Sequence, residues 1–312
     1  MELEKDGLSL DIVRLKNLFI KELESLNFSK NTILTYNQQL LVFSDFCEEI
    51  SDEVRLKNIK QMHISYFFAW LEAKIQPKNA TKASYYRTLK SFFNFLTKNN
   101  DDLIDYDYLF KKFPLKLKKG ESKEVNHIKL ADMNKILDYL QKTIEKNNNY
   151  KNNRNSLLVK LLFGAGLRIS EALNLKLIDF TTSDINDEFY ELNITAKGGE
   201  RQKAYVLKNL IRDEFSYISQ KLSLADYVFL TSRNTQLKRQ TAYINLKRIY
   251  EKAGVFHKEG CHILRHSFAM DLMAKDINLG VIQKALRHKN INTTMIYADA
   301  TSNMIKEALK KR

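Results

Sequence analysis

The chain is 312 residues long and strongly basic, because 51 lysines and arginines against 37 aspartates and glutamates give a formal net charge of +14. Its only two cysteines, Cys47 and Cys261, are too few for a disulfide framework or a cysteine-based zinc site, which fits a reducing compartment. The N-terminus is too charged for a secretory signal and no apolar run approaches the roughly 20 residues of a membrane helix, so we expect a cytoplasmic protein with no membrane partner.

The length allows two domains, and the first of them has a helical composition. No glycine lies between Gly7 and Gly120, and apolar residues recur there at the spacing of buried helix faces. This spacing predicts four helices, the second capped by Ser29 or Asn31, at residues 10–26, 29–46, 64–71 and 81–96. Four basic side chains on the polar faces, which either lie in solvent or bind DNA, are Lys30, Lys82, Arg87 and Lys90.

A short basic and polar stretch, PLKLKKGESKE, follows these helices. Its composition is typical of a linker rather than of a packed element. We therefore expect a helical domain at residues 1–115 and a second domain at 125–312, joined by residues 116–124.

The second domain is predicted to be mostly helical with one small β element. IKLADMNKILDYLQKTI predicts an amphipathic helix, and NSLLVKLLFGAGLRISEALNL predicts a helix, a glycine break and another helix opening near Ser170. Residues 189–195 and 203–207 are β-rich and flank a Gly-Gly turn, which predicts a hairpin with Lys197 at its tip. The expected fold class is therefore mostly α with a small β-hairpin or sheet (α+β).

LKRQTAYINLKRIYEKAG predicts a further amphipathic helix whose first residues are basic and polar. Phosphates favour helix N-termini, and arginine or glutamine can bond to base edges. The candidates for DNA binding at this helix start are Lys238, Arg239 and Gln240.

Residues 260–300 carry four side chains suited to phosphoryl transfer. His262 and Arg265 are three residues apart, so they share one face of a helix, and His288 and Tyr297 follow. A guanidinium matches phosphate oxygens, an imidazole moves protons near neutral pH, and a tyrosine hydroxyl can act as a nucleophile. We interpret this stretch as half of a site for covalent catalysis.

The other half lies upstream, where GLRISE carries Arg168 and ITAKGGE carries Lys197. With HILRHSFA and ALRHKNINTTMIY, these blocks resemble the tyrosine site-specific recombinase (phage-integrase-like) family. All six functional positions of that family are filled in order, by Arg168, Lys197, His262, Arg265, His288 and Tyr297. Two residues depart from the family's pattern, since Cys261 replaces a common proline and Arg287 replaces the usual glycine. Glu171 either orients an arginine or is an ordinary helix residue.

The resemblance implies a helical, SAM-like core-binding domain followed by a tyrosine-recombinase catalytic domain. It also implies that Tyr297 cleaves and rejoins DNA through a 3′-phosphotyrosine intermediate, with no metal, no other cofactor and no ATP. In this scheme the two arginines clamp the phosphate, Lys197 protonates the leaving oxygen, His262 takes the tyrosine proton and His288 donates a hydrogen bond. The implied partners are a double-stranded recombination site and further copies of the chain, as a cyclic tetramer on two sites.

Within the family, the modest length resembles Xer-type recombinases, which resolve chromosome dimers during chromosome partition and cell division, in some cases with a DNA translocase as activator. A mobile-element integrase, a type IB topoisomerase and a DNA-binding protein that lost the chemistry are the alternatives, and the full set of six groups argues against the last. His262 and His266 have metal-ligand spacing, but Ile263 stands where HExxH has glutamate, so no zinc site is expected.

The last segment, TSNMIKEALKKR, has apolar residues at helical spacing. A helix this short is marginal alone and needs a surface to dock on. It either folds back on its own domain or, as in the family, docks on a neighbouring protomer.

Overall fold

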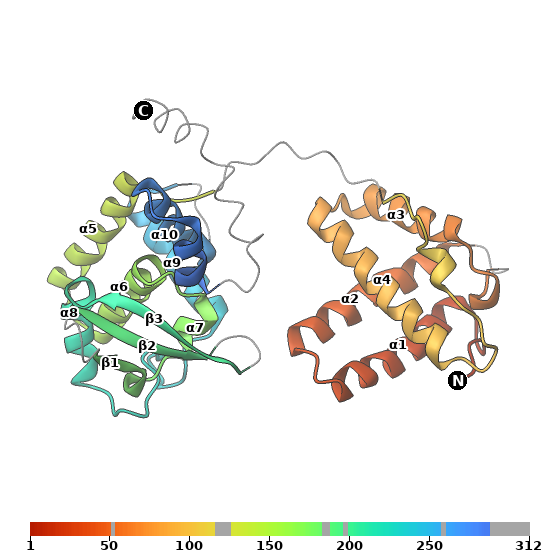
Figure 1. Ribbon diagram of the computed structural model, residues 1–312, viewed down its shortest axis with the longest axis horizontal. Coiled ribbons are helices and arrows are strands. Elements are labelled where there is room, and N and C mark those ends of the chain that lie inside the picture. The colour runs from red at the N-terminus through yellow and green to blue at the C-terminus, as the bar shows by residue number, and fades with distance from the viewer. Residues whose placement is uncertain (51–53, 116–125, 183–187, 196–198, 257–259, 288–312) are drawn as a thin grey trace. The chain divides into compact units, whose positions relative to one another are not determined.

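A computed structural model shows two compact units, Met1–Glu121 and Ser122–Arg312, each of which is described by itself (Figure 1). The residues that the structure describes are 1–50, 54–115, 126–182, 188–195, 199–256 and 260–287. No helix in these ranges is long and apolar enough to cross a lipid bilayer.

The first unit is helical, and all four predicted helices are present. Ser29 caps the second one, because its Oγ accepts the Thr32 N–H at 3.2 Å, whereas Asn31 lies inside the helix. The helices are α1 (Leu8–Ser25), α2 (Lys30–Glu49), α3 (Gln61–Ile75) and α4 (Asn79–Asn99), with two 3₁₀ turns at Leu56–Asn58 and Asp107–Leu109.

Aromatic side chains form the core of this unit. Phe43, Phe67, Phe92 and Phe93 have no exposed surface, and the rings of Phe43 and Phe67 meet edge to face with centroids 5.1 Å apart. Burying one such ring stabilises the fold by about 1.5–3 kcal/mol, so these four rings anchor the helices to one another. The prediction that the apolar stripes are core is confirmed.

The second unit is built around one helix that is buried on almost every side. The middle of this helix, α6, carries Leu157, Leu158, Val159, Leu161 and Leu162, each 1% exposed or less. The one charged residue of this stretch, Lys160, pairs with Glu214 on α8 at 2.6 Å, and α6 packs against helices α5, α8, α9 and α10. The helices of this unit are α5 (Leu130–Lys146), α6 (Tyr150–Gly164), α7 (Ile169–Leu173), α8 (Lys208–Ser219), α9 (Arg239–Lys252), α10 (His262–Ala274) and α11 (Leu279–Leu286), with a 3₁₀ turn at Leu177–Asp179.

A three-stranded antiparallel sheet lies beside α8 (Figure 1). Its strands, in the order β1-β2-β3, are β1 (Phe180–Thr182), β2 (Phe189–Thr195) and β3 (Arg201–Leu207). Alternate residues point into the core, and Leu192 pairs with Ala204 there. The predicted hairpin is confirmed as β2 and β3, while β1, α8 and α11 were not predicted.

The break between α6 and α7 depends on Gly166. Its φ of +57° is left-handed, and a Cβ added there would lie 2.5 Å from Cδ1 of Phe268 on α10. Only glycine lets α10 approach this closely while the chain turns. The turn brings the start of α7 against α10, where the candidate catalytic residues lie.

Candidate active site

Arg168 stands at the N-terminal end of α7 and is held by a carboxylate in the first turn. Its backbone N–H donates to Oε2 of Glu171 at 2.8 Å, and its Nη1 donates to Oε1 at 2.5 Å. The Glu171 side chain is 3% exposed, whereas that of Arg168 is 36% exposed. A buried acceptor therefore orients Arg168, whose side chain remains partly exposed.

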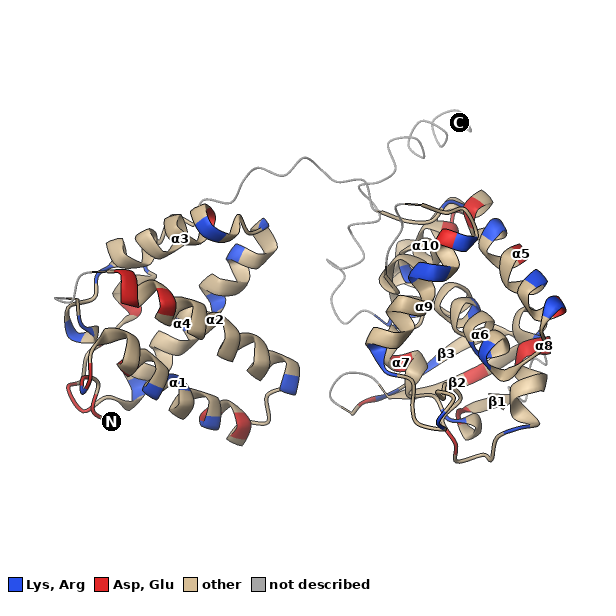
Figure 2. Cartoon of the chain, turned by 180° about the vertical axis from the view of Figure 1, so that it is seen from behind, with Lys and Arg blue, Asp and Glu red and all other residues tan. Residues whose placement is uncertain are grey.

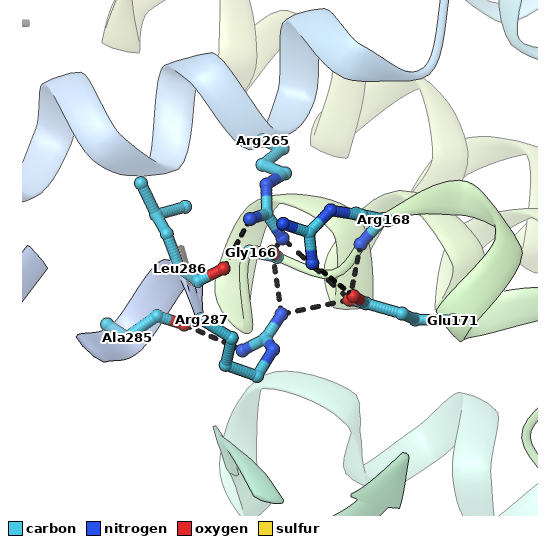
Figure 3. A network of polar contacts seen from close by, with 7 residues as sticks. All are labelled: Gly166, Arg168, Glu171, Arg265, Ala285, Leu286 and Arg287. Atoms are coloured by element: carbon cyan, nitrogen blue, oxygen red, sulfur yellow. Dashed lines mark hydrogen bonds and ion pairs between the residues drawn. The ribbon is translucent and has the colours of Figure 1, made fainter. Parts of the chain in front are cut away.

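Arg265, on α10, is far from Glu171 in sequence but approaches the same carboxylate. Its Nη1 donates to the Gly166 carbonyl at 2.5 Å, and its Nη2 donates to the Leu286 carbonyl. The same Nη1 lies 3.7 Å from Oε2 of Glu171. Two arginines that are distant in sequence thus meet at one carboxylate (Figure 3).

Arg287 is a third arginine at this point, and its contacts were not predicted. Its Nη2 donates to Oε2 of Glu171 at 3.1 Å and to the Gly166 carbonyl at 3.0 Å, while Nη1 donates to Ala285 at 2.6 Å (Figure 3). Its side chain is 6% exposed. The only sequence signal was a cation beside His288 at a position where the family usually has glycine.

The charges around Glu171 favour an anionic ligand. Burial would raise the pKa of Glu171, but the charge of Arg287 and the hydrogen bonds and charge of Arg168 outweigh it and lower the pKa below its ordinary value. Glu171 is therefore ionised at neutral pH. Three guanidinium groups and one carboxylate leave two positive charges at a largely buried site, which suits a bound phosphate.

His262, the first residue of α10, is suited to accept a proton. Although the residue is exposed, partial desolvation of the ring lowers its pKa, and the charges of Arg239, Arg265 and Arg168 lower it further. A pKa below the ordinary value of 6.5 means that the imidazole is neutral at pH 7. A neutral imidazole beside two arginines can act as a general base for a group brought to the same phosphate.

His266 lies one turn further along α10 and is half-buried. Burial lowers its pKa, and the charges of His262, Arg265 and His127 act in the same direction. Among the residues that the structure describes, no three side chains of the metal-binding types gather in one place. The lowered pKa means that the half-buried His266 ring is neutral at pH 7.

The start of α9 lies close to the start of α10. The charge of Arg239 acts on the pKa of both His262 and Cys261, although the two helices are separate in sequence. Lys238, Arg239 and Gln240 are all exposed there. Arg239, one of the candidate DNA-binding residues, is therefore close enough to act on the candidate catalytic residue His262.

The basic residues of the first unit differ in exposure. Lys30 and Arg87 are exposed and Lys90 is half-buried, but Lys82 is 8% exposed and pairs with Glu72. The expectation that Lys82 lies on an exposed polar face is therefore wrong, because the ion pair holds it between α3 and α4. Figure 2 shows lysine and arginine spread over the helices of both units, with acidic residues among them.

Three of the six candidate catalytic residues lie outside the described residues. They are Lys197, His288 and Tyr297. The expected linker at 116–124 and the C-terminal segment at 301–312 also lie outside them. The structure thus brings together Arg168, Arg265 and His262, and adds Glu171 and Arg287 to them.

Two family matches cover most of the chain. Residues 126–304 match the phage integrase family, and residues 17–100 match the phage integrase N-terminal SAM-like domain. The first match alone spans more than half of the 312 residues.

The chain is similar in sequence to several tyrosine recombinases. The chain is 31% identical over 239 residues to tyrosine recombinase XerH of Campylobacter jejuni, which is 74% of this chain and 65% of that protein. It is 28% identical over 298 residues to tyrosine recombinase XerD of Rickettsia bellii, covering 90% of this chain and 92% of that one.

Solved structures share the fold. A crystal structure of XerH site-specific recombinase bound to palindromic difH substrate, in a post-cleavage complex, aligns with a TM-score of 0.77 at 22% identity, covering 99% of this chain and 98% of that one. The Tn1549 transposon integrase in complex with transposon right end DNA aligns with a TM-score of 0.69 at 17% identity, covering 96% and 98%.

Proposed function

The chain belongs to the phage integrase family and is a tyrosine recombinase, an enzyme of DNA strand exchange, and from that premise we propose that it cleaves and rejoins DNA through a 3′-phosphotyrosine at Tyr297. The observation that carries the proposal is the convergence of Arg168 and Arg265 on buried Glu171. This arrangement fixes two guanidinium groups at one place before any phosphate arrives, so little reorganisation remains for the reaction.

In the proposed cleavage step, the phenol oxygen of Tyr297 attacks the scissile phosphorus while the bond from phosphorus to the 5′ oxygen breaks. The phenol proton passes to His262, and Lys197 gives a proton to the leaving 5′ oxygen. A phosphodiester carries one negative charge, and a phenolate adds a second. Arg168 and Arg265 balance these charges at the non-bridging oxygens, with a hydrogen bond from His288.

Religation reverses these steps with a new 5′ hydroxyl as the nucleophile. The tyrosine ester is a phosphodiester-type linkage, so it keeps the free energy of the broken bond. No ATP is consumed, and the positive side chains take the place that a metal ion has in other phosphoryl transfers.

The proposed substrate is a double-stranded recombination site. The net charge of +14 supports a polyanionic partner, and the related XerH was crystallised with its difH substrate. We propose contacts from the α9 start at Lys238, Arg239 and Gln240, and from Lys30, Arg87 and Lys90 in the first domain. Lys82 would contact DNA only if its ion pair with Glu72 opened. Strand exchange between two sites requires several copies of the chain, for which a cyclic tetramer is the proposed assembly.

The proposed biological role is Xer-type resolution of chromosome dimers in the cytoplasm, in chromosome partition and cell division, with a DNA translocase as the activator. The names of the relatives, XerH and XerD among them, support this role. The second candidate function is integration of a mobile element. The structural alignment with the Tn1549 transposon integrase, which covers 96% of this chain, is the observation that favours it.

Recovery of covalently attached DNA from cells tests the proposal. Protein carrying its DNA is isolated under denaturing conditions, the attached ends are sequenced, and a Tyr297→Phe strain serves as the control. One recurring chromosomal site supports dimer resolution, and ends at the borders of a mobile element support integration. Adducts that persist in the Phe strain, or none in the wild type, would overturn the assignment of Tyr297.

A further inference from the structure

Arg287 has a backbone conformation that is unfavourable for its residue type. It caps the C-terminal end of α11 with φ of +55°, in the left-handed region where glycine is the usual residue. A side chain at such a position is strained, so its contacts must compensate for keeping arginine there.

The contacts of Arg287 reach well beyond its own helix. The helix cap itself is made by the backbone N–H of Arg287, which donates to the Gln283 and Lys284 carbonyls and does not need the guanidinium. Nη1 of that guanidinium donates to the Ala285 carbonyl at 2.6 Å. Nη2 extends instead to the loop between α6 and α7, at the Gly166 carbonyl, and to Oε2 of Glu171 on α7. Arg287 therefore joins the end of α11 to the two groups that hold the other arginines.

Each of these two groups is shared with one of the arginines that we assign to the phosphate. The Gly166 carbonyl accepts from Arg265 at 2.5 Å and from Arg287 at 3.0 Å. The Glu171 carboxylate uses Oε1 for Nη1 of Arg168, while Oε2 accepts from the backbone N–H of Arg168 and from Arg287. Fixing Oε2 therefore fixes the direction of Oε1, and with it the guanidinium of Arg168.

We propose that Arg287 is a positioning residue for the transfer reaction, which holds Glu171 and the Gly166 loop so that Arg168 and Arg265 are set for one phosphate. This inference rests on the proposed function of those two arginines. Arg287 acts through Glu171 and not on the phosphate directly, because its side chain is 6% exposed and its guanidinium is directed at protein acceptors.

The test uses Arg287→Gly in the full-length protein. Glycine is favoured at φ of +55°, so the variant should fold, while all three guanidinium contacts are lost. Single-turnover formation of the covalent adduct on a nicked substrate should fall by up to about 100-fold, the scale of a small misplacement of catalytic groups. Arg287→Lys keeps the charge but not the fork, and should rescue cleavage only in part.

Lys284→Ala is the matched control, because it removes one exposed positive charge from the same helix. If loss of charge alone explained the effect, Lys284→Ala and Arg287→Gly would weaken cleavage equally. A double-mutant cycle with Glu171→Gln then tests whether Arg287 acts on cleavage through Glu171. Arg287→Gly should reduce cleavage less in the Gln background than in the wild type, because the ion pair with Glu171 is already gone and the bond to the Gly166 carbonyl remains to be lost. An equal loss in both backgrounds would overturn the proposal.

The pH dependence gives a readout that a purely structural role would not move. The charged groups facing Glu171 are Arg168 on its own helix, Arg265 on α10 and Arg287 at the end of α11, with His262 beyond the first two. Without Arg287 the pKa of Glu171 should rise, so the loss of cleavage in acid should begin at a higher pH than in the wild type.

A measurement without DNA separates this inference from the proposed function. Glu171 has a lowered pKa in the folded state, so the stability it contributes is lost as pH falls through that value. Arg287→Gly should bring the folded-state pKa of Glu171 closer to its unfolded value, so the melting temperature of the variant should fall less on acidification than that of the wild type. If Arg287→Gly and the wild type show the same pH dependence of melting temperature and the same pH dependence of cleavage, the role of Arg287 is overturned. Absence of any adduct in the wild type would overturn only the proposed function.

Discussion

Arg265 and Arg287 donate to the same carbonyl oxygen, that of Gly166, at 2.5 and 3.0 Å. One guanidinium comes from the first half of α10 and the other from the C-terminal end of α11. Arg168, the N-cap of α7, follows that carbonyl by two residues. The loop between α6 and α7 therefore fixes three arginines relative to one another, and a change in the loop or in its carboxylate should reach all of them.

Replacing Glu171 with glutamine should reduce cleavage without reducing DNA binding. The amide keeps the size of the side chain but loses the charge that holds Arg168 and Arg287, so the free energy of unfolding should fall by about 2 kcal/mol. The site becomes more positive, and the affinity for DNA should hold or rise. Glu145→Gln, an exposed change on α5, is the control. Cleavage and binding that fall together in Glu171→Gln would contradict this expectation.

The two arginines should differ in how their loss affects the fold. Arg168→Ala and Arg265→Ala should each reduce cleavage on the order of 10²-fold or more, the scale of losing one preorganised donor. Arg265 is buried and holds two backbone carbonyls, so its removal should also lower the melting temperature. Arg168 is 36% exposed and, among the described residues, its side chain donates only to Glu171, so its removal should lower the melting temperature less than that of Arg265. Thermal denaturation and single-turnover cleavage measure the two effects, and equal melting shifts would be the contrary result.

Removing the charge of Arg239 should shift the acidic side of the pH–rate profile of cleavage. Arg239 is one of the cations that lower the pKa of His262, after desolvation, so Arg239→Gln should raise that pKa. His262 would then become protonated at a higher pH, and cleavage at saturating DNA should decline earlier on acidification. Lys238→Gln removes a neighbouring charge that is not among the influences on His262. Both variants should weaken binding, and a shared shift of the pH profile would refute the assignment of the effect to Arg239.

The parts of the fold that could be predicted are those set by local patterns. The cap at Ser29 and the hairpin of β2 and β3 depend on neighbouring residues, so spacing and turn chemistry were enough. The burial of Lys82 depends on Glu72 on another helix, which no local pattern contains. The eight-residue helix α11 is too short for its periodicity to stand out.

The candidate site likewise contains residues that local motifs predict and residues that only the fold brings together. Arg168, His262 and Arg265 were found from ordered motifs, because the chemistry requires those residue types. The role of Glu171 was left open, since only its 3% exposure and its three arginine neighbours distinguish it from an ordinary helix residue. Arg287 was noted only as a departure, because its contacts depend on a left-handed backbone and a fold-dependent approach of α11 to the Gly166 loop.

Gly166→Ala should damage the fold and the reaction together. The new Cβ would lie 2.5 Å from Cδ1 of Phe268, at φ of +57°, so left-handed strain and overpacking add to a loss of about 2–4 kcal/mol in the free energy of unfolding. The displaced Gly166 carbonyl also serves Arg265 and Arg287, so cleavage should fall as well. Gly254→Ala is the matched control, because Gly254 has φ of +72° with nothing within 4 Å of the added Cβ.

Chemical denaturation of both alanine variants separates strain from the steric clash. Gly254→Ala should lose only the strain, about 1–2 kcal/mol, and should leave cleavage unchanged. Phe268→Ala removes the ring that meets the new Cβ, so the double variant with Gly166→Ala should be more stable than the sum of the two single losses predicts. If the two losses simply add, the approach of α10 does not explain why glycine is needed at position 166. In that case the left-handed turn alone accounts for it, because any residue with a side chain is strained there.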